Sequence, residues 1–200
     1  MPLRELLESL SVTGMTIPII AVVIRVVWLV VEYPYLRGHR VSAAKNWDKN
    51  SAKLWDIANA IECVGLLLGF LGIGRIHLES NVLGILGLGL LVAGVAIRWA
   101  SIYTLGKFFT GIVLIKEDHR LIRSGLYTHV RHPAYTGALL AHLGLGLAFT
   151  NWFSLLLSVV PYIVAVTYRV HVEEQALRDA FGSEYLTYAR DTKRLIPKVY

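Results

Sequence analysis

The sequence predicts an all-α polytopic membrane protein with about five transmembrane helices. Hydrophobic residues make up 55% of the 200 positions and charged residues only 17%, whereas a soluble domain carries about 25% charged residues. The hydrophobic residues gather in runs close to the roughly 20 residues that a helix needs to cross a bilayer core. We therefore expect one integral membrane domain that covers residues 1–200.

Five hydrophobic runs account for these spans. They lie at about residues 12–31, 54–73, 82–105, 133–149 and 152–170. Residues 1–105 would hold three N-terminal spans, and residues 106–200 the remaining two. Asn151 is the only obvious turn residue between the last two runs, so we expect these runs to form a tight antiparallel hairpin.

The basic residues predict how the chain is oriented in the membrane. They concentrate in three segments, which hold Arg37, Arg40, Lys45, Lys49 and Lys53; Lys107, Lys116, Arg120, Arg123 and Arg131; and Arg178, Arg190, Lys193, Arg194 and Lys198. Lys and Arg favour cytoplasmic loops, so five spans place the N-terminus outside and the C-terminus in the cytosol. The formal charge of +6 is then explained by anionic lipid headgroups, not by nucleic acid.

Other compositional features exclude several site types and predict contacts between spans. The single cysteine, Cys63, excludes an internal disulfide framework and a multi-cysteine zinc site, and we expect no metal. Arg25 and Glu62 lie inside the first two spans, where charge is costly, so we expect a buried ion pair, with a role near a substrate as the alternative. Arg98 is a third intramembrane charge. Gly65 and Gly69 form a GxxxG pair that favours close helix packing.

Polar and aromatic residues precede the fourth span. Pro133 is suited to the first turn of a helix, and helix N-termini attract anions, so His132 and Tyr135 would lie beside such an end. The alternative is that Arg131 anchors lipid headgroups and Tyr135 belongs to an aromatic belt. Residues 116–127 lead into the fourth span and are expected to form a loop or short strand that lies over the hairpin. The backbone of residues 116–127 could pair with the edge of a purine.

A second polar group lies at the end of the fifth span. Arg169 and Glu173 are four residues apart and share one helix face, with Glu174 adjacent. An interfacial ion pair is one interpretation. A site that binds a cation through its acids and an anion through its arginine is the other, because two adjacent acids beside anionic lipid would be repelled.

These two groups carry a resemblance to a known family. The pattern His119-x-Leu121-Ile122-x-x-Gly125-x-Tyr127-x-x-x-Arg131-His132-Pro133-x-Tyr135 resembles the C-terminal signature of the isoprenylcysteine carboxyl methyltransferases, a group that also includes phospholipid N-methyltransferases. So does Arg169-x-x-x-Glu173-Glu174-x-x-Leu177-x-x-x-Phe181-Gly182-x-x-Tyr185-x-x-Tyr188 with Ile196-Pro197. The resemblance covers about residues 111–200.

The resemblance implies S-adenosylmethionine as the cofactor and a cytosol-facing pocket formed by the C-terminal part. Carried over by position, Arg169 would be the catalytic residue that binds the substrate. Glu173 would hold the cofactor together with His119, Arg120, Leu121, Ile122, Tyr127, His132, Pro133, Ala134 and Tyr135.

The function that follows is carboxyl O-methylation of an isoprenylcysteine-like or other lipophilic carboxylate in the membrane. The short chain resembles a prokaryotic member, which would place it in the cell inner membrane with a lipophilic or prenylated substrate. Three alternatives remain at this point: N- or S-methylation of a phospholipid amine or small thiol, a sterol-reductase-like enzyme that would use a nicotinamide cofactor, and a non-catalytic lipid-binding membrane protein.

Overall fold

A computed structural model describes residues 14–37, 45–77, 81–115 and 118–197. The expected start of the first span at residues 12–13 lies outside this part of the chain. So do three residues used to predict the orientation, Arg40, Lys116 and Lys198.

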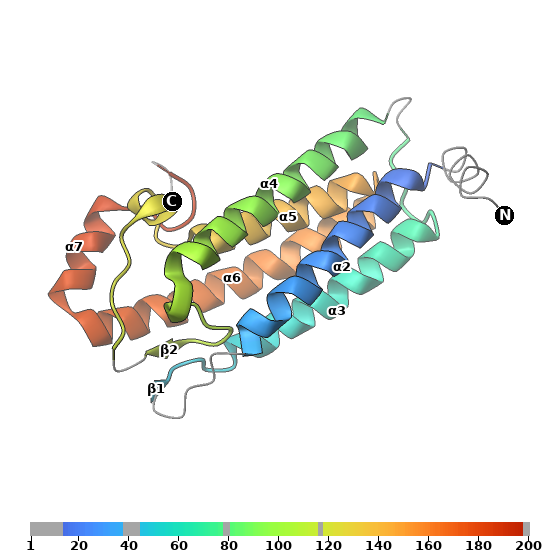
Figure 1. The fold of residues 1–200 in the computed structure, drawn as a ribbon. Coiled ribbons are helices and arrows are strands. Elements are labelled where there is room, and N and C mark those ends of the chain that lie inside the picture. Colours follow the sequence, from blue (N-terminus) through green and yellow to red (C-terminus); the bar gives the residue numbers. More distant parts are fainter. Residues whose placement is uncertain (1–13, 38–44, 78–80, 116–117, 198–200) are drawn as a thin grey trace.

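Five helices run side by side and form the body of the molecule (Figure 1). They are α2 (Thr16–Arg37), α3 (Ser51–Phe70), α4 (Val82–Leu105), α5 (Pro133–Ala148) and α6 (Trp152–Phe181). Each coincides with one of the five expected spans, which confirms the all-α polytopic fold. The hairpin of α5 and α6 is also confirmed, and Asn151 caps α6 by accepting hydrogen bonds from the amides of Phe153 and Ser154 at 2.9 and 3.1 Å.

Within the described residues, three segments are long and apolar enough to cross a membrane on their own: Thr16–Tyr35, Val82–Phe108 and Trp152–Phe181. The other two helices differ for separate reasons. α3 carries Lys53, Asp56 and Glu62. α5 has 16 residues, a length of about 24 Å, which is shorter than a bilayer core of about 30 Å. Both helices instead pack against the longer ones.

The fifth span was expected to end near residue 170, and this boundary is wrong. α6 continues to Phe181 and is followed by α7 (Ser183–Asp191). Its last turns are polar but contain good helix formers such as Glu, Gln, Ala and Leu, so hydrophobicity ends before the helix does. Gly182, with φ of +50°, provides the left-handed backbone that turns the chain from α6 into α7.

The short elements gather at one end of the bundle, where α4 and α6 end and α5 begins (Figure 1). There β1 (Lys45–Asn46) pairs antiparallel with β2 (Leu114–Ile115), beside two 3₁₀ turns, η1 (Gly106–Phe108) and η2 (Gly125–Thr128). The C-terminal segment joins them, because the amide of Arg131 donates to the carbonyl of Lys193 at 2.7 Å. Of the two forms expected for residues 116–127, a loop or a short strand, the described part is a loop that leads into η2, and β2 precedes it.

Small residues bring α4 and α5 into close contact. A methyl group added at Gly144 would overlap the backbone of Leu91, and one at Gly137 would lie 2.6 Å from the amide nitrogen of Arg98. Gly94 faces the backbone of Ala141 in the same way. This arrangement follows the small-xxx-small rule for helices in lipid.

The close packing expected at Gly65 and Gly69 is also present, and the structure shows that α6 is the partner helix. Gly65 lies against Leu157, and its carbonyl accepts a hydrogen bond from the hydroxyl of Ser154 at 2.9 Å.

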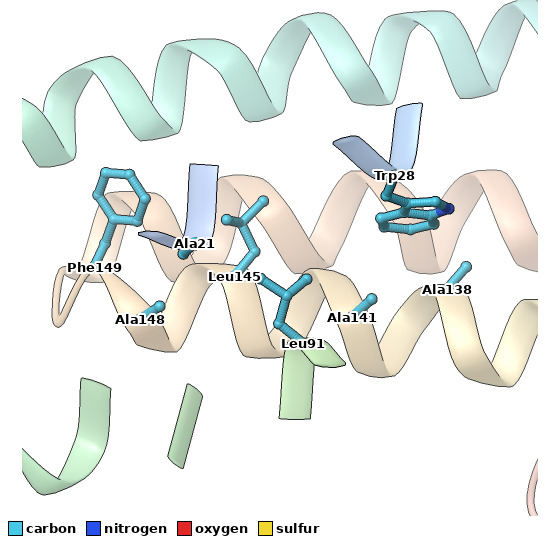
Figure 2. Packing of buried hydrophobic residues seen from close by; sticks show 8 residues of the cluster. All are labelled: Ala21, Trp28, Leu91, Ala138, Ala141, Leu145, Ala148 and Phe149. Carbon is cyan, nitrogen blue, oxygen red and sulfur yellow. The ribbon is translucent and has the colours of Figure 1, made fainter. Parts of the chain in front are cut away.

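Helix α5 lies at the centre of the hydrophobic core. Figure 2 shows Leu91 of α4 beside Leu145 and Ala141 of α5, and Ala138 of α5 near Trp28 of α2. The cluster consists of Ala21, Trp28, Leu91, Ala138, Ala141, Leu145, Ala148 and Phe149. Large apolar side chains such as Val30, Ile85 and Val164 are exposed. An apolar exterior of this kind suits contact with lipid chains.

The intramembrane charges are paired inside the bundle. Arg25 donates from Nε to Glu62 at 3.1 Å, which confirms the expected pair, and Glu62 also contacts the ring of His142. Arg98 has a partner that the sequence did not indicate, because its guanidinium binds Glu32, which also accepts from the indole of Trp28. Pairing offsets much of the cost of burying each charge.

The α4–α5 contact leads to a prediction about stability. Gly144→Ala should destabilise the protein by about 1–3 kcal/mol, because the added methyl separates two backbones. Gly89, on the exposed face of α4 with no atom within 4 Å of an added methyl, is the matched control. Gly89→Ala should leave stability unchanged or raise it by up to about 1 kcal/mol. Thermal unfolding in detergent measures both, and equal midpoints for the two variants would contradict the packing argument.

Candidate functional site

A cavity opens at the end of the bundle where the short elements gather. It holds about 860 Å³ of atom-free space, part of which is open to solvent. Its walls come from the end of α4, the segment from η1 to β2, the η2 turn, the first turn of α5, and helices α6 and α7.

Most of the residues singled out in the sequence line this cavity. They are His119, Arg120, Leu121, Ile122, Tyr127, His132, Ala134, Tyr135, Arg169 and Glu173. Pro133 does not line it. Its ring is buried in the first turn of α5, so in this fold Pro133 starts the helix that carries its neighbours.

Three polar side chains form a connected chain along the cavity wall. Arg169 donates from Nε to the hydroxyl of Tyr135 at 2.9 Å, and that hydroxyl donates to Glu173 at 2.7 Å. Arg169 and Glu173 lie one turn apart on α6, and Tyr135 comes from the first turn of α5. One cation and one anion are thereby held on the same wall, with a neutral hydroxyl between them.

The two adjacent glutamates have different surroundings. Glu174 is buried and accepts hydrogen bonds from Arg131 at 3.1 Å, Arg178 at 3.3 Å and Arg194 at 3.0 Å. Glu174 therefore joins α6 to Arg131, which precedes α5, and to Arg194 in the C-terminal segment. The side chain of Glu173 keeps 31% of its surface exposed, so this carboxylate can accept bonds from a ligand.

The remaining walls are largely aromatic and apolar. His119 lies between the rings of Phe108 and Phe181, at centroid distances of 5.0 and 5.7 Å. Sequence reasoning assigned no role to the following lining residues: Leu105, Phe108, Phe109, Thr110, Ile112, Val113, Leu114, Ile115, Leu177, Tyr185 and Tyr188. Leu177, Tyr185 and Tyr188 belong to the family pattern quoted above, in which they received no role.

The tyrosines of the cavity are neutral donors. Burial raises the pKa of Tyr188 to about 12, and its hydroxyl donates to the carbonyl of Tyr127 at 2.7 Å. Burial, together with the negative charge of Glu173, raises the pKa of Tyr127 well above its usual value. Both hydroxyls therefore stay protonated at neutral pH.

The cavity is connected to the charges within the bundle. Arg98, which binds Glu32, also donates from Nη1 to the carbonyl of Ala134 at 3.2 Å. Ala134 lies in the first turn of α5 and lines the cavity. The buried ion pair thus helps to fix the position of this wall.

Arg169 has further contacts with the N-terminal half of the chain. Its Nη1 donates to the hydroxyl of Ser51 at 3.3 Å and lies 3.6 Å from Asp48, and its Nη2 donates to the carbonyl of Gly111 at 2.7 Å. In the sequence, Asp48 carries only the signal of a polar residue before a helix, so its contact with Arg169 was missed. Among the described residues, no group of three or more His, Cys, Asp or Glu side chains could hold a metal ion.

Comparison with known proteins agrees with this geometry. Residues 86–179 match the model of the isoprenylcysteine carboxyl methyltransferase (ICMT) family. Protein-S-isoprenylcysteine O-methyltransferase B of Arabidopsis thaliana is 28% identical over 145 residues, which make up 72% of this chain and 72% of that protein. Protein-S-isoprenylcysteine O-methyltransferase of Saccharomyces cerevisiae is 29% identical over 165 residues, or 80% of this chain and 69% of that protein.

A solved structure has the same fold. The eukaryotic intramembrane Ras methyltransferase ICMT superposes with a TM-score of 0.60 at 24% identity, over 72% of this chain and 52% of that one. This chain thus spans about half of the solved protein. The matched region contains both polar groups of the cavity wall, those before α5 and those on α6. Over residues 86–179, the chain is similar to the isoprenylcysteine carboxyl methyltransferase family.

Proposed function

We propose that this protein transfers a methyl group from S-adenosylmethionine to the carboxylate of an isoprenylcysteine or a similar lipophilic acid. The observation that carries the proposal is the chain of contacts from Arg169 through Tyr135 to Glu173 on one cavity wall. Such a wall offers a cation to an anionic acceptor and an anion to a cationic donor. It lies at the end of an apolar bundle, where a lipid-like substrate and a polar cofactor can meet.

The residues of the cavity fit this cofactor. Glu173, partly exposed, suits the ammonium group or the ribose hydroxyls. The rings of Phe108 and His119 and the side chain of Leu121 provide an apolar wall for a flat base. His132 also lines the cavity. Its ring stacks on that of Tyr135 with centroids 5.7 Å apart, and its nitrogens add polar atoms to this wall.

The reaction needs little from the protein beyond alignment. When bound, S-adenosylmethionine supplies a methyl group on a positively charged sulfur. A carboxylate is already ionised at neutral pH, so its oxygen can form the new C–O bond without a general base, while the C–S electron pair stays on sulfur. The chain therefore contributes position and the exclusion of water.

Arg169 is the residue suited to hold the acceptor. It is buried, and Tyr135, Ser51 and Gly111 fix its orientation. An arginine held in this way binds one carboxylate oxygen and leaves the other to attack. The apolar part of the substrate would enter between helices from the lipid.

Methylation of an amine is disfavoured by the same geometry. An amine must first lose a proton, so this alternative needs a base, for which His132 and Glu174 are the two candidates. Glu174 is enclosed by Arg131, Arg178 and Arg194, which hold it as a charged structural anchor. His132 would remain the only candidate of the two.

The basic segments support an orientation with the cavity in the cytosol. Lys49, Lys107, Arg123 and Arg190 belong to the segments at the cavity end (Figure 1). Because Lys and Arg favour the cytoplasmic side, these residues support a cytosolic C-terminus, and we propose a prokaryotic inner membrane as the location.

Methyl transfer tests the proposal directly. The purified protein, given labelled S-adenosylmethionine and a farnesyl-cysteine analogue, should form a methyl ester that is released by base. Arg169→Met should lower kcat/KM about 100-fold, because a hydrogen bond to a charged group contributes roughly 2–3 kcal/mol. Arg190→Met, on α7, is a control that removes a charge outside the cavity lining. A base-stable product would instead support N- or S-methylation.

Glu173 should act on cofactor affinity. Glu173→Gln is expected to weaken binding of both S-adenosylmethionine and its demethylated product by about 10-fold or more, because both carry the ammonium group and the hydroxyls. Titration calorimetry measures both constants. The adjacent Glu174→Gln should mainly lower the thermal unfolding midpoint, because it leaves three arginines, of which Arg131 is almost fully buried, without their anion. Unchanged affinity for both ligands in Glu173→Gln would contradict this assignment.

A further inference from the structure

A second carboxylate faces Arg169 from a part of the chain outside the region that matches the family. Asp48 lies between β1 and α3, and its Oδ1 is 3.6 Å from Nη1 of Arg169. Both side chains are almost fully buried, with 11% and 7% of their surfaces exposed. Their charges therefore interact with little screening by water.

Three hydrogen bonds fix the position of Asp48. Its Oδ1 accepts from the hydroxyl of Ser51 at 2.8 Å and from the amide of Val113 at 3.3 Å. Its Oδ2 accepts from the amide of Ala52 at 3.1 Å, in the first turn of α3. The Asp48 carboxylate is held by α3 and by Val113, the residue before β2, so it has little freedom to move away when a ligand binds.

The guanidinium of Arg169 is shared among several acceptors. Its Nε is used by Tyr135, its Nη2 by Gly111, and its Nη1 by Ser51, with Asp48 alongside. A substrate carboxylate on Arg169 would be the second anion beside one cation. Like charges within a few ångströms repel, and each disfavours the ionised form of the other.

We infer that Asp48 raises the energy of the bound substrate carboxylate and so favours its methylation. The inference rests on the proposed function. As the acceptor oxygen forms its bond to the methyl carbon, the negative charge of the carboxylate disappears and the C–S electron pair returns to sulfur. Repulsion by Asp48 is therefore present in the bound substrate and diminishes in the transition state, which is the differential effect that increases kcat. The neutral ester product is not repelled.

Repulsion by Asp48 should weaken substrate binding but increase turnover, so removing the charge should change the two quantities in opposite directions. Asp48→Asn and Asp48→Ser remove the charge but keep residues that are favoured before a helix. Both variants should bind a farnesyl-cysteine analogue about 10-fold more tightly, measured by calorimetry in the presence of demethylated cofactor without turnover. Their kcat should fall about 10-fold, and KM for S-adenosylmethionine should not change. Asp56→Asn, the same chemical change at an exposed position of α3, should match the wild type in all three measurements.

Other outcomes would overturn the inference. Unchanged or weaker binding of the analogue in both variants would show that Asp48 only orients Arg169 or has no role in the reaction. Loss of binding of the demethylated cofactor in both variants would make Asp48 a purely structural residue. If the wild type binds the analogue but methylates no carboxylate, the proposed function fails, whereas the affinity comparison still reports on the contact between Asp48 and Arg169.

Discussion

The arrangement of the cavity depends on the hydrogen bonds that the buried guanidinium of Arg169 donates. A guanidinium away from water needs hydrogen-bond acceptors, and Arg169 has three of them, in α3, in the segment before β2 and in α5. These segments are distant in the sequence. Meeting the hydrogen-bonding needs of one side chain therefore brings the N-terminal half of the chain against the C-terminal half at the site.

A second set of charges lies deeper in the bundle and supports the first. Glu32 and Arg98 join α2 to α4, and Arg98 continues to the carbonyl of Ala134. Arg25, Glu62 and His142 join α2, α3 and α5. Because charges in lipid are stable only with their partners, each pair favours one packing of the helices, and the α4–α5 glycines allow that packing at short distance.

The sequence predicts the five helices well because each contains a long, mainly apolar run. It also predicts α5 to begin at Pro133, and it places His119, Tyr127, Tyr135, Arg169 and Glu173 in one cavity through their resemblance to the family pattern. The end of α6 could not be read from hydrophobicity, because the helix continues beyond its apolar part.

Contacts between distant residues were the least accessible from the sequence. The pairing of Arg25 with Glu62 could be proposed because both charges are rare within their spans. Arg98 could equally have paired with other acids, and nothing before α3 distinguished Asp48 from an ordinary helix-capping residue. Such contacts depend on how the helices rotate and pack, which one sequence pattern does not specify.

The central claim is that the cavity beside Arg169 and Glu173 holds the methyl donor. An experimental structure of the protein with S-adenosylhomocysteine tests it most directly. The account predicts the ligand between η1, η2 and α6, with its ammonium group or ribose at Glu173 and its sulfur facing the Arg169 side of the cavity. Ligand bound elsewhere on the protein, or with its sulfur turned away from Arg169, would contradict it.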